Sequence, residues 1–558
     1  MKNRYLDIME KVLSAYSDEH ILRYFNEVKE KGLTEHGFPR LTANIGILIA
    51  HGRRSDLLPI FTEMMDFCCK TIPTVKAAND FSVREIVCCL LEIEKAGIVP
   101  REKTDGWRAD FATIVPATCY NYFASSLYDT VKNWALFTGV SEYFRLDAGI
   151  GGDIDFIDMQ LGQQLQWMDE NGMYLDHPSD PDYYHPVQYD LVSRGLFCMA
   201  LNRGYRGKYY TVIDALLKKA GLMTLDMQSP SGEVPFGGRS NQYLHNEAML
   251  AVSLEYEAKR YAREGKPELA ARFKAATDRA LSAIEGWLKK EPISHIKNRY
   301  PFDSMYGCEP YGYFDKYMIT AASMLYAAYL ICEDVPFEPS ADLKPTVAMT
   351  SHYFHKLFVK AGGYGLEFDL FGHELHDASG LGRVHRTGAP AAICLSCPFP
   401  ATPKYRIDTK PFSFSLCSAV KHTGQWLFGA KFGNSYTVLD RSANDVSASA
   451  SLLCKFVGGK EVREFYTVNE EGVLISLQSD GVFGFALPAL EFDGEKHTEI
   501  TVTDNTLTVA YEGWICKYTT SGKIESLDRT VGNRNGHYLA YIATGKNIMH
   551  IKIEITKA

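Results

Sequence analysis

The sequence predicts a multidomain α + β protein: an N-terminal (α/α) toroid of helical hairpins followed by a C-terminal antiparallel β-sandwich. Its 558 residues are too many for one ordinary core. Apolar residues recur at three- and four-residue spacing as far as about residue 335. From about residue 345 they alternate or run together in short segments. We therefore expect the toroid over residues 1–340 and the sandwich over residues 341–558, with the boundary between Pro336 and Pro345.

The helical half contains successive segments of about 10–20 residues joined by short connections rich in Gly, Pro, Asn and Asp. Successive hairpins of this kind fit a toroid in which inner and outer helices alternate and loops at one end line a deep pocket. A helical solenoid is the rival interpretation, but no fixed sequence period is present. Helices are expected over residues 5–30, 41–51, 55–70, 81–97, 118–138, 151–168, 186–203, 208–224, 241–263, 267–289 and 313–333.

The C-terminal part reads as strands because its apolar residues alternate or form short runs between turns such as Asp480-Gly481 and Asp493-Gly494. This spacing is typical of an antiparallel sandwich of about 200 residues. Strands are expected within residues 412–417, 426–432, 472–477, 498–502, 506–511 and 549–555.

Composition excludes several function classes. The net charge is −9 and no basic run stands out, so a nucleic-acid partner is not expected. No apolar stretch approaches the roughly 18 residues that span a bilayer, and the N-terminus lacks the apolar core of a signal peptide. The 13 scattered cysteines fit buried free thiols. We therefore expect a cytoplasmic protein with no membrane partner.

Cofactor and metal motifs are weak. The segment from Gly149 to Asp158 resembles a phosphate loop, but it follows no expected strand and lacks the Gly-Lys-Ser/Thr ending. His373 and His376 with Asp377 could form a metal cluster, but this spacing is a weak signal without a further well-placed ligand. The sequence therefore predicts neither a cofactor nor a metal site.

The most polar junction of the helical half is residues 230–250, where a loop rich in Gly and Pro leads into a helix. The first turn of a helix offers unpaired N–H groups and partial positive charge, which suit an anionic ligand. An ordinary capped helix is the alternative. The candidate residues here are Arg239, Asn241, Gln242, Tyr243, His245 and Glu247.

Other candidates lie along the chain. His185 and Tyr189 flank the start of a helix at Pro186, although His185 could be structural. A Tyr-rich loop at residues 298–317 offers Tyr311 and Tyr313 as a phenolic acid or base. Trp107 could stack on a sugar. Asp129 and Asn133 would share a helix face that is either exposed or turned to the pocket. Arg383, His385 and Arg386 could reach a carboxylate across the domain interface.

A toroid followed by a sandwich, with Asn241 and His245 at a helix start and a later Tyr-rich loop, resembles the heparinase II/III-like and oligoalginate lyases. Glucuronidase-type hydrolases on the same toroid are also similar. In motif the resemblance is limited to residues 236–247 and, more loosely, 306–317 and 380–390.

The resemblance implies an enzyme that cleaves oligosaccharides containing uronic acids by β-elimination. The expected cytoplasmic location favours short imported chains and hence exo action. The resemblance also implies that Arg239 and Asn241 neutralise the carboxylate, His245 is a base or orienting group, and Tyr313 or Tyr311 is the acid. A hydrolase would need two carboxyl groups, Glu247 being one candidate. A non-catalytic sugar-binding protein is the third reading, and the aromatic-rich surface would also suit a homo-oligomer.

Overall fold

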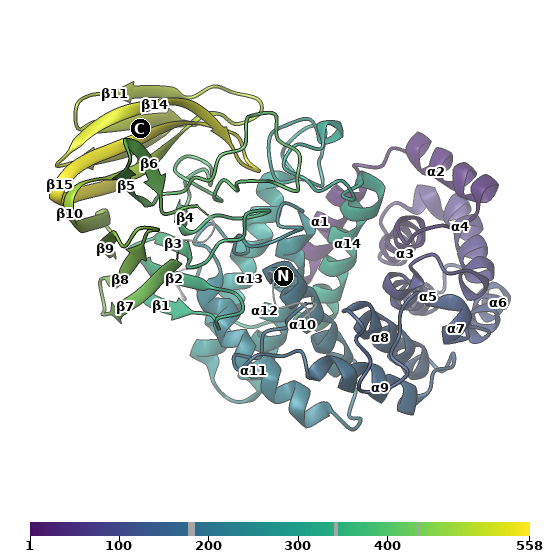
Figure 1. The fold of residues 1–558 in the computed structure, drawn as a ribbon. Coiled ribbons are helices and arrows are strands. Elements are labelled where there is room, and N and C mark those ends of the chain that lie inside the picture. Colours follow the sequence, from purple (N-terminus) through teal and green to yellow (C-terminus); the bar gives the residue numbers. More distant parts are fainter. Residues whose placement is uncertain (177–184, 340–343, 432–434) are drawn as a thin grey trace.

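The computed structural model describes residues 1–176, 185–339, 344–431 and 435–558. Helices occupy one side of the molecule and strands the other (Figure 1). None of the described helices is long and apolar enough to cross a membrane. The helices are α1 (Lys2–Leu13), α2 (Asp18–Lys31), α3 (Gly37–Ala50), α4 (Leu58–Thr71), α5 (Val83–Ala96), α6 (Arg101–Ala112), α7 (Pro116–Cys119), α8 (Trp134–Asp147), α9 (Ile154–Leu165), α10 (Val187–Asn202), α11 (Tyr210–Met227), α12 (His245–Arg263), α13 (Pro267–Trp287) and α14 (Phe314–Ile331).

Six of these helices form a closed inner ring. In the order α3, α5, α8, α10, α12 and α14 each packs against the next, and α14 returns to α3. The sequence of α3 explains its inner position, because it is apolar or small on all sides and is buried along almost its whole length. The remaining helices pack outside, as α4 does on α3 and α13 on α12. The predicted toroid is confirmed.

Three expected helices are wrong in detail. The one expected over residues 5–30 is two helices, α1 and α2, which are separated at residues 14–17. Residues 120–133 form turns rather than the middle of a helix over 118–138, because the Asp129 carboxylate accepts hydrogen bonds from the backbone and hydroxyls of Ser125 and Ser126. Such local side-chain bonds compete with helix formation. The helix expected from residue 241 begins at His245 instead, after Ser240 adopts a left-handed φ of 62°.

The C-terminal half contains a four-stranded sheet and an eleven-stranded sheet in which every strand pairing is antiparallel. Side chains from both sheets form one apolar core, so the predicted sandwich is confirmed. The strands are β1 (Thr346–Met349), β2 (Lys356–Ala361), β3 (Tyr364–Asp369), β4 (Gly380–Arg386), β5 (Ser418–His422), β6 (Gln425–Phe428), β7 (Ser435–Ala443), β8 (Ala448–Lys455), β9 (Glu461–Asn469), β10 (Gly472–Phe492), β11 (Glu499–Val502), β12 (Thr506–Tyr511), β13 (Trp514–Thr520), β14 (Lys523–Gly532) and β15 (His537–Lys557).

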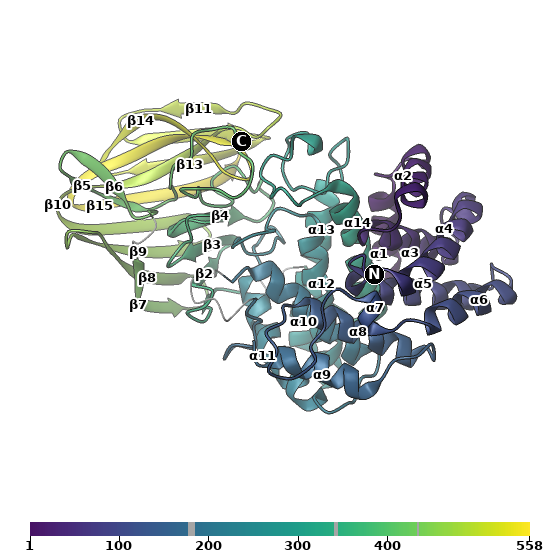
Figure 2. The same cartoon turned by 45° about the vertical axis from the view of Figure 1, so that its right-hand side comes forward.

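The small sheet lies between the helices and the large sheet (Figure 2). Its strands hold the loop that precedes α12: Arg383 donates to the carbonyl of Val234 at 2.6 Å, and Glu367 accepts from the N–H of Phe236 at 3.2 Å. The predicted boundary at residues 340–341 lies outside the described residues and stays a prediction.

Candidate active site

A cavity of about 330 Å³ opens where the inner helices begin, and we call it the mouth pocket. Its walls come from the first turns of α3, α8, α10, α12 and α14 and from the loops before them. Several helix N-termini therefore surround one space, and their partial positive charges favour a negatively charged ligand. Its lining residues are His36, Arg40, Ala78, Phe81, Lys132, Asn133, Trp134, Phe137, Asp176, Gln188, Tyr189, Val192, Arg239, Ser240, His245, Met249, Tyr311, Lys316, Tyr317, Thr320 and Met324.

The charged side chains of the mouth pocket favour an anion as well. Arg40, Lys132, Arg239 and Lys316 line it, whereas Asp176 is the one carboxylate among its described lining residues. Lys132 has no carboxylate partner within the described chain, and its ammonium lies over the ring of Trp134, 5.4 Å from the centroid. Arg40 and Lys316 also pair with Glu85 and Glu35 outside the lining, so the positive charge that an entering carboxylate would meet comes chiefly from Lys132.

Arg239 is held in place from two sides. Its Nη2 donates to Oδ2 of the buried Asp176 at 2.5 Å, and its guanidinium lies 4.4 Å from the ring centroid of Tyr189. Burial raises the pKa of Tyr189, and the cation above its ring opposes that rise. The guanidinium is thereby fixed at the wall of the pocket.

His245, the first residue of α12, supplies a neutral imidazole. Burial, and then the charge of Arg40, lower its pKa to about 3. The ring stacks at 5.7 Å on Tyr317, which in turn stacks at 4.5 Å on Tyr243. Its Nδ1 has no hydrogen-bond partner. At neutral pH this imidazole is therefore uncharged and able to accept a proton.

Tyr311 brings a phenol to the same pocket. Its hydroxyl is 2.8 Å from the hydroxyl of Ser240, and burial raises its pKa, so the phenol keeps its proton at neutral pH. Ser240 is fixed through its N–H, which donates to Oε1 of Glu309 at 2.9 Å. The same oxygen accepts from Arg534 of the sandwich at 2.7 Å. The second domain thus positions a wall of the pocket without lining it.

The structure brings five of the predicted site residues together in the mouth pocket: His245, Tyr189, Arg239, Asn133 and Tyr311. The other members of the 230–250 stretch lie outside its lining. Glu247 is fully buried in an ion pair with Lys297 at 2.7 Å. Asn241 donates to the carbonyl of Pro235, Gln242 to that of Lys297, and Tyr243 packs behind Tyr317, so these residues support the loop.

Four further predicted residues lie outside the lining of the mouth pocket. Trp107 is buried on the outer helix α6, with its indole N–H on Asp66. Asp129 caps an exposed turn rather than sharing a helix face with Asn133. His185 packs near the carbonyl of Asp176, outside the pocket lining. Tyr313 is 61% exposed and also lies outside it.

The predicted residues of β4 stay within the sandwich and its interface. Arg383 bonds the carbonyls of Val234 and Ser396. His385 bonds Ser229, and Arg386 bonds the carbonyl of Ile555. These contacts join the domains or the sheet, and Arg383 also lies 4.0 Å from the Glu233 carboxylate across the interface. None of the three residues lines the mouth pocket, and their role in substrate binding stays a prediction.

Sequence reasoning missed several lining residues, notably Arg40, Lys132 and Lys316. The sequence could have indicated Arg40, because it is the one charged residue of α3, and this helix is too hydrophobic to lie at the surface. Lys132 and Lys316 had none, because only ring closure brings their segments to one cavity.

Within the described residues, no group of three or more His, Cys, Asp and Glu side chains could hold a metal ion. Asp377 instead accepts the N–H of Gly238 at 2.8 Å, and His376 faces Glu309 at 3.9 Å. The described lining of the mouth pocket supplies cations, the imidazoles of His36 and His245, and phenols.

No family model matches the chain, and no curated protein matches it. Among solved structures, a heparinase III aligns over 93% of this chain and 78% of its own, at 10% identity and a TM-score of 0.50. The alignment with a heparan sulfate lyase from Pedobacter heparinus covers 93% of this chain and 73% of the lyase, at 9% identity and a TM-score of 0.44. The alignment with a glycosyl hydrolase family 88 protein from Bacteroides vulgatus covers 59% of this chain and 99% of that protein, at 12% identity and a TM-score of 0.37. The heparinase III likeness supports the toroid-plus-sandwich fold, and at this identity it supports the fold alone.

Proposed function

We propose that this protein is a lyase that cleaves oligosaccharides containing uronic acids by β-elimination. The observation that carries the proposal is the meeting of Arg239, the neutral His245 and Tyr311 around one cavity with an excess of cations. The heparinase III that resembles this chain in fold has a name that agrees with this chemistry.

Each residue has a distinct role in the proposed reaction. Arg239 binds the uronate carboxylate, with Lys132 as a second cation, and so stabilises the negative charge that develops when C5 loses its proton. His245 removes that proton, and the electron pair forms the C4–C5 double bond as the C4–O bond breaks. Tyr311 protonates the leaving oxygen. The proton held by His245 then returns to the Tyr311 phenolate through water, which restores both groups.

The anionic substrate would itself prepare His245 for this role. In the structure, burial and Arg40 keep the pKa of His245 low, and a bound carboxylate would partly cancel the charge of Arg40. The imidazole would therefore become a stronger base when a uronate is present. A cavity of about 330 Å³ is the size of a small-ligand site, which favours action on chain ends.

Hydrolysis is less well supported by the described residues. An inverting hydrolase needs two carboxyl groups about 6.5–9.5 Å apart, with room for water between them. Asp176 is the one carboxylate among the described lining residues, and it is paired with Arg239. Glu247 and Glu309 are buried in ion pairs with Lys297 and Arg534.

The two reactions differ in their products. We expect the protein to generate near-ultraviolet absorbance from hyaluronan, chondroitin, heparan or alginate oligosaccharides, since elimination creates a conjugated C4–C5 double bond. Arg239→Gln should raise KM and lower kcat on the same substrate, because the carboxylate interaction strengthens in the transition state. Release of saturated uronic acid without new absorbance would identify a hydrolase and overturn the proposal.

A further inference from the structure

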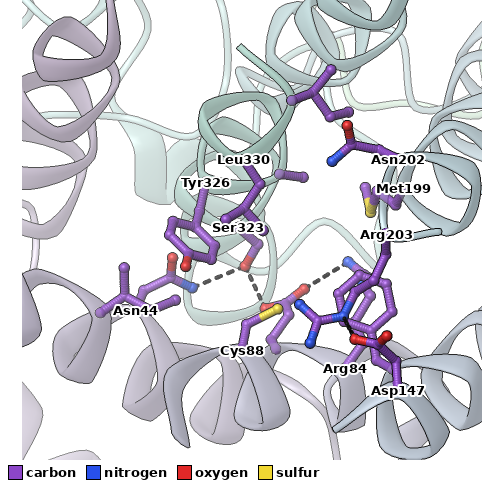
Figure 3. A pocket seen from close by; sticks show the side chains of 15 residues that line it. Asn44, Arg84, Cys88, Asp147, Met199, Asn202, Arg203, Ser323, Tyr326 and Leu330 are labelled. Atoms are coloured by element: carbon purple, nitrogen blue, oxygen red, sulfur yellow. Dashed lines mark hydrogen bonds and ion pairs between the residues drawn. The ribbon is translucent and has the colours of Figure 1, made fainter. Parts of the chain in front are cut away.

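The two guanidinium groups of the mouth pocket, those of Arg40 and Arg239, are held from different parts of the molecule. Behind Arg40 lies a second cavity of about 330 Å³, toward the carboxyl ends of α3, α8, α10 and α14 (Figure 3). Its described lining balances two cations against two carboxylates, one of which is Glu85. Glu85 accepts from Arg40 at 2.9 Å, so Arg40 is held from within the helical ring.

Arg239 is held through the backbone that carries it, residues 234–240, which we call the Arg239 segment. Among residues 232–250, all of which the structure describes, Arg239 is the one that is not buried. The segment belongs to no helix or strand, so its buried N–H groups need acceptors from elsewhere. A single guanidinium therefore emerges from a buried loop into the mouth pocket.

Every second N–H group of the Arg239 segment donates to a buried carboxylate. The four pairs are Val234 with Glu247 at 3.2 Å, Phe236 with Glu367 at 3.2 Å, Gly238 with Asp377 at 2.8 Å and Ser240 with Glu309 at 2.9 Å. The carboxylates come from α12, from β3, from the loop between β3 and β4, and from the loop before α14. Because hydrogen bonds to charged acceptors are the stronger ones, the backbone is fixed at four points.

Two of these carboxylates, Glu367 and Asp377, belong to the sandwich, and cations of the same domain lie beside them. Arg383 lies 3.2 Å from Glu367 and also donates to the carbonyl of Val234 at 2.6 Å. Burial raises the pKa of Glu367 to about 7, against the charges of Arg383 and Lys356. Burial likewise raises the pKa of Asp377, and Lys356 again opposes the rise.

The backbone and the guanidinium of Arg239 are fixed separately. Its neighbours Gly238 and Ser240 are each held by a carboxylate, which sets the direction in which the Arg239 side chain leaves the backbone. The guanidinium is held by Asp176 and lies over the ring of Tyr189. Because a binding group that is misplaced by about 1 Å loses much of its effect, the position of this backbone bears on affinity.

We propose that Glu367 and Asp377 are positioning residues for the mouth pocket: through the Arg239 segment, the sandwich sets the direction of Arg239 and hence the affinity for a carboxylate. The inference rests on the proposed function in one respect, that a uronate is the ligand of Arg239. Glu464 on β9 is the matched control. It is also buried, it accepts the N–H of Ser418 at 3.2 Å, and burial raises its pKa.

Hydrogen exchange tests the segment independently of any reaction. At about pH 8 Glu367 is largely ionised. Glu367→Gln should then speed exchange of the Phe236 amide, and Asp377→Asn that of Gly238, each at least about tenfold, because a bond to a charged acceptor is lost. Glu464→Gln should leave both amides within about twofold.

Leucine in place of Glu367 or Asp377 removes the acceptor altogether and should enlarge the effect in variants that circular dichroism shows to be folded. Exchange that is unchanged in the Gln, Asn and Leu variants would overturn the proposal. So would unprotected amides of Phe236 and Gly238 in the unsubstituted protein, a readout that needs no variant.

Titration with sodium D-glucuronate, followed by NMR, tests the consequence for binding. Glu367→Gln and Asp377→Asn should each weaken glucuronate at least about fivefold. Glu464→Gln should leave its affinity within about twofold, and in the Arg239→Gln background the first two substitutions should add no further loss.

The outcomes separate positioning from general stability and from the reaction. An equal loss of affinity in Glu464→Gln, a loss that persists in Arg239→Gln, or no saturable glucuronate binding would contradict the proposal. If the expected differences in affinity appear but no substrate gives near-ultraviolet absorbance, the lyase reaction is wrong and the positioning role stands.

Discussion

Tyr311 and Tyr313 lie two positions apart, but only Tyr311 lines the mouth pocket. Its hydroxyl contacts Ser240 at 2.8 Å, whereas Tyr313 is 61% exposed. If Tyr311 is the proton donor, Tyr311→Phe should lower kcat by about 10²- to 10⁴-fold, the usual range for losing a general acid. Tyr313→Phe is the matched control and should stay within about twofold. Similar kcat values for the two variants, measured by product absorbance, would remove Tyr311 from the mechanism.

His245 should make stability depend on pH in a defined direction. Its pKa is lowered from 6.5 to about 3 in the folded protein. Between these values the unfolded chain binds a proton at this residue that the folded chain does not. The contribution of His245 to the free energy of unfolding is therefore full above about pH 6.5. It falls as the pH decreases toward 3, by up to about 1.4 kcal/mol per pH unit.

Replacing His245 by Asn removes this proton linkage. The free energy of unfolding, measured by urea denaturation at pH 7 and pH 5, should then fall less for the variant than for the unsubstituted protein. Equal decreases would show that folding leaves the pKa of His245 unshifted, which would contradict a buried imidazole that stays uncharged at pH 5.

Among the structural elements, the loop before α12 is the one on which the mouth pocket depends most. Gly238 has φ 71°, and a Cβ there would lie 2.8 Å from Cβ of Pro186. Gly265 has the same φ, with nothing within 4 Å of an added Cβ. The two glycines therefore separate backbone strain from steric conflict.

We expect Gly238→Ala to lower Tm clearly more than Gly265→Ala, which carries only the strain of a left-handed alanine. Gly238→Ala should also lower kcat, because Arg239 and Ser240 follow directly. Thermal melting and steady-state rates check both effects. Equal Tm losses would mean that the loop has room to move away from Pro186.

At the scale of the whole molecule, Arg534 connects the sandwich to the mouth pocket through Glu309 and Ser240. Arg534→Met would leave Glu309 buried without its cation, which typically costs about 3–5 kcal/mol. We expect a lower Tm by calorimetry and lower activity, because Ser240 loses its anchor. Arg529→Met, on the exposed face of the same domain, should leave both unchanged. Normal activity in Arg534→Met would show that the sandwich does not position the site.

The periodicity of apolar residues determined the two-domain architecture by itself. The hydrophobicity of α3 and the alternation along the strands depend only on residues close together in the sequence. Helices and strands can therefore be predicted from these patterns. The same reasoning failed at residues 120–133, where Asp129 forms a turn that outcompetes the helix.

Tertiary structure alone decided which polar residues share a cavity. Glu247 and His245 are two positions apart in α12, so one faces Lys297 in the core while the other faces the mouth pocket. Lys132 and Lys316 reach that pocket from distant segments only because α14 closes the ring against α3. Helical periodicity thus specified that an inner face exists, and ring closure selected the side chains that meet there.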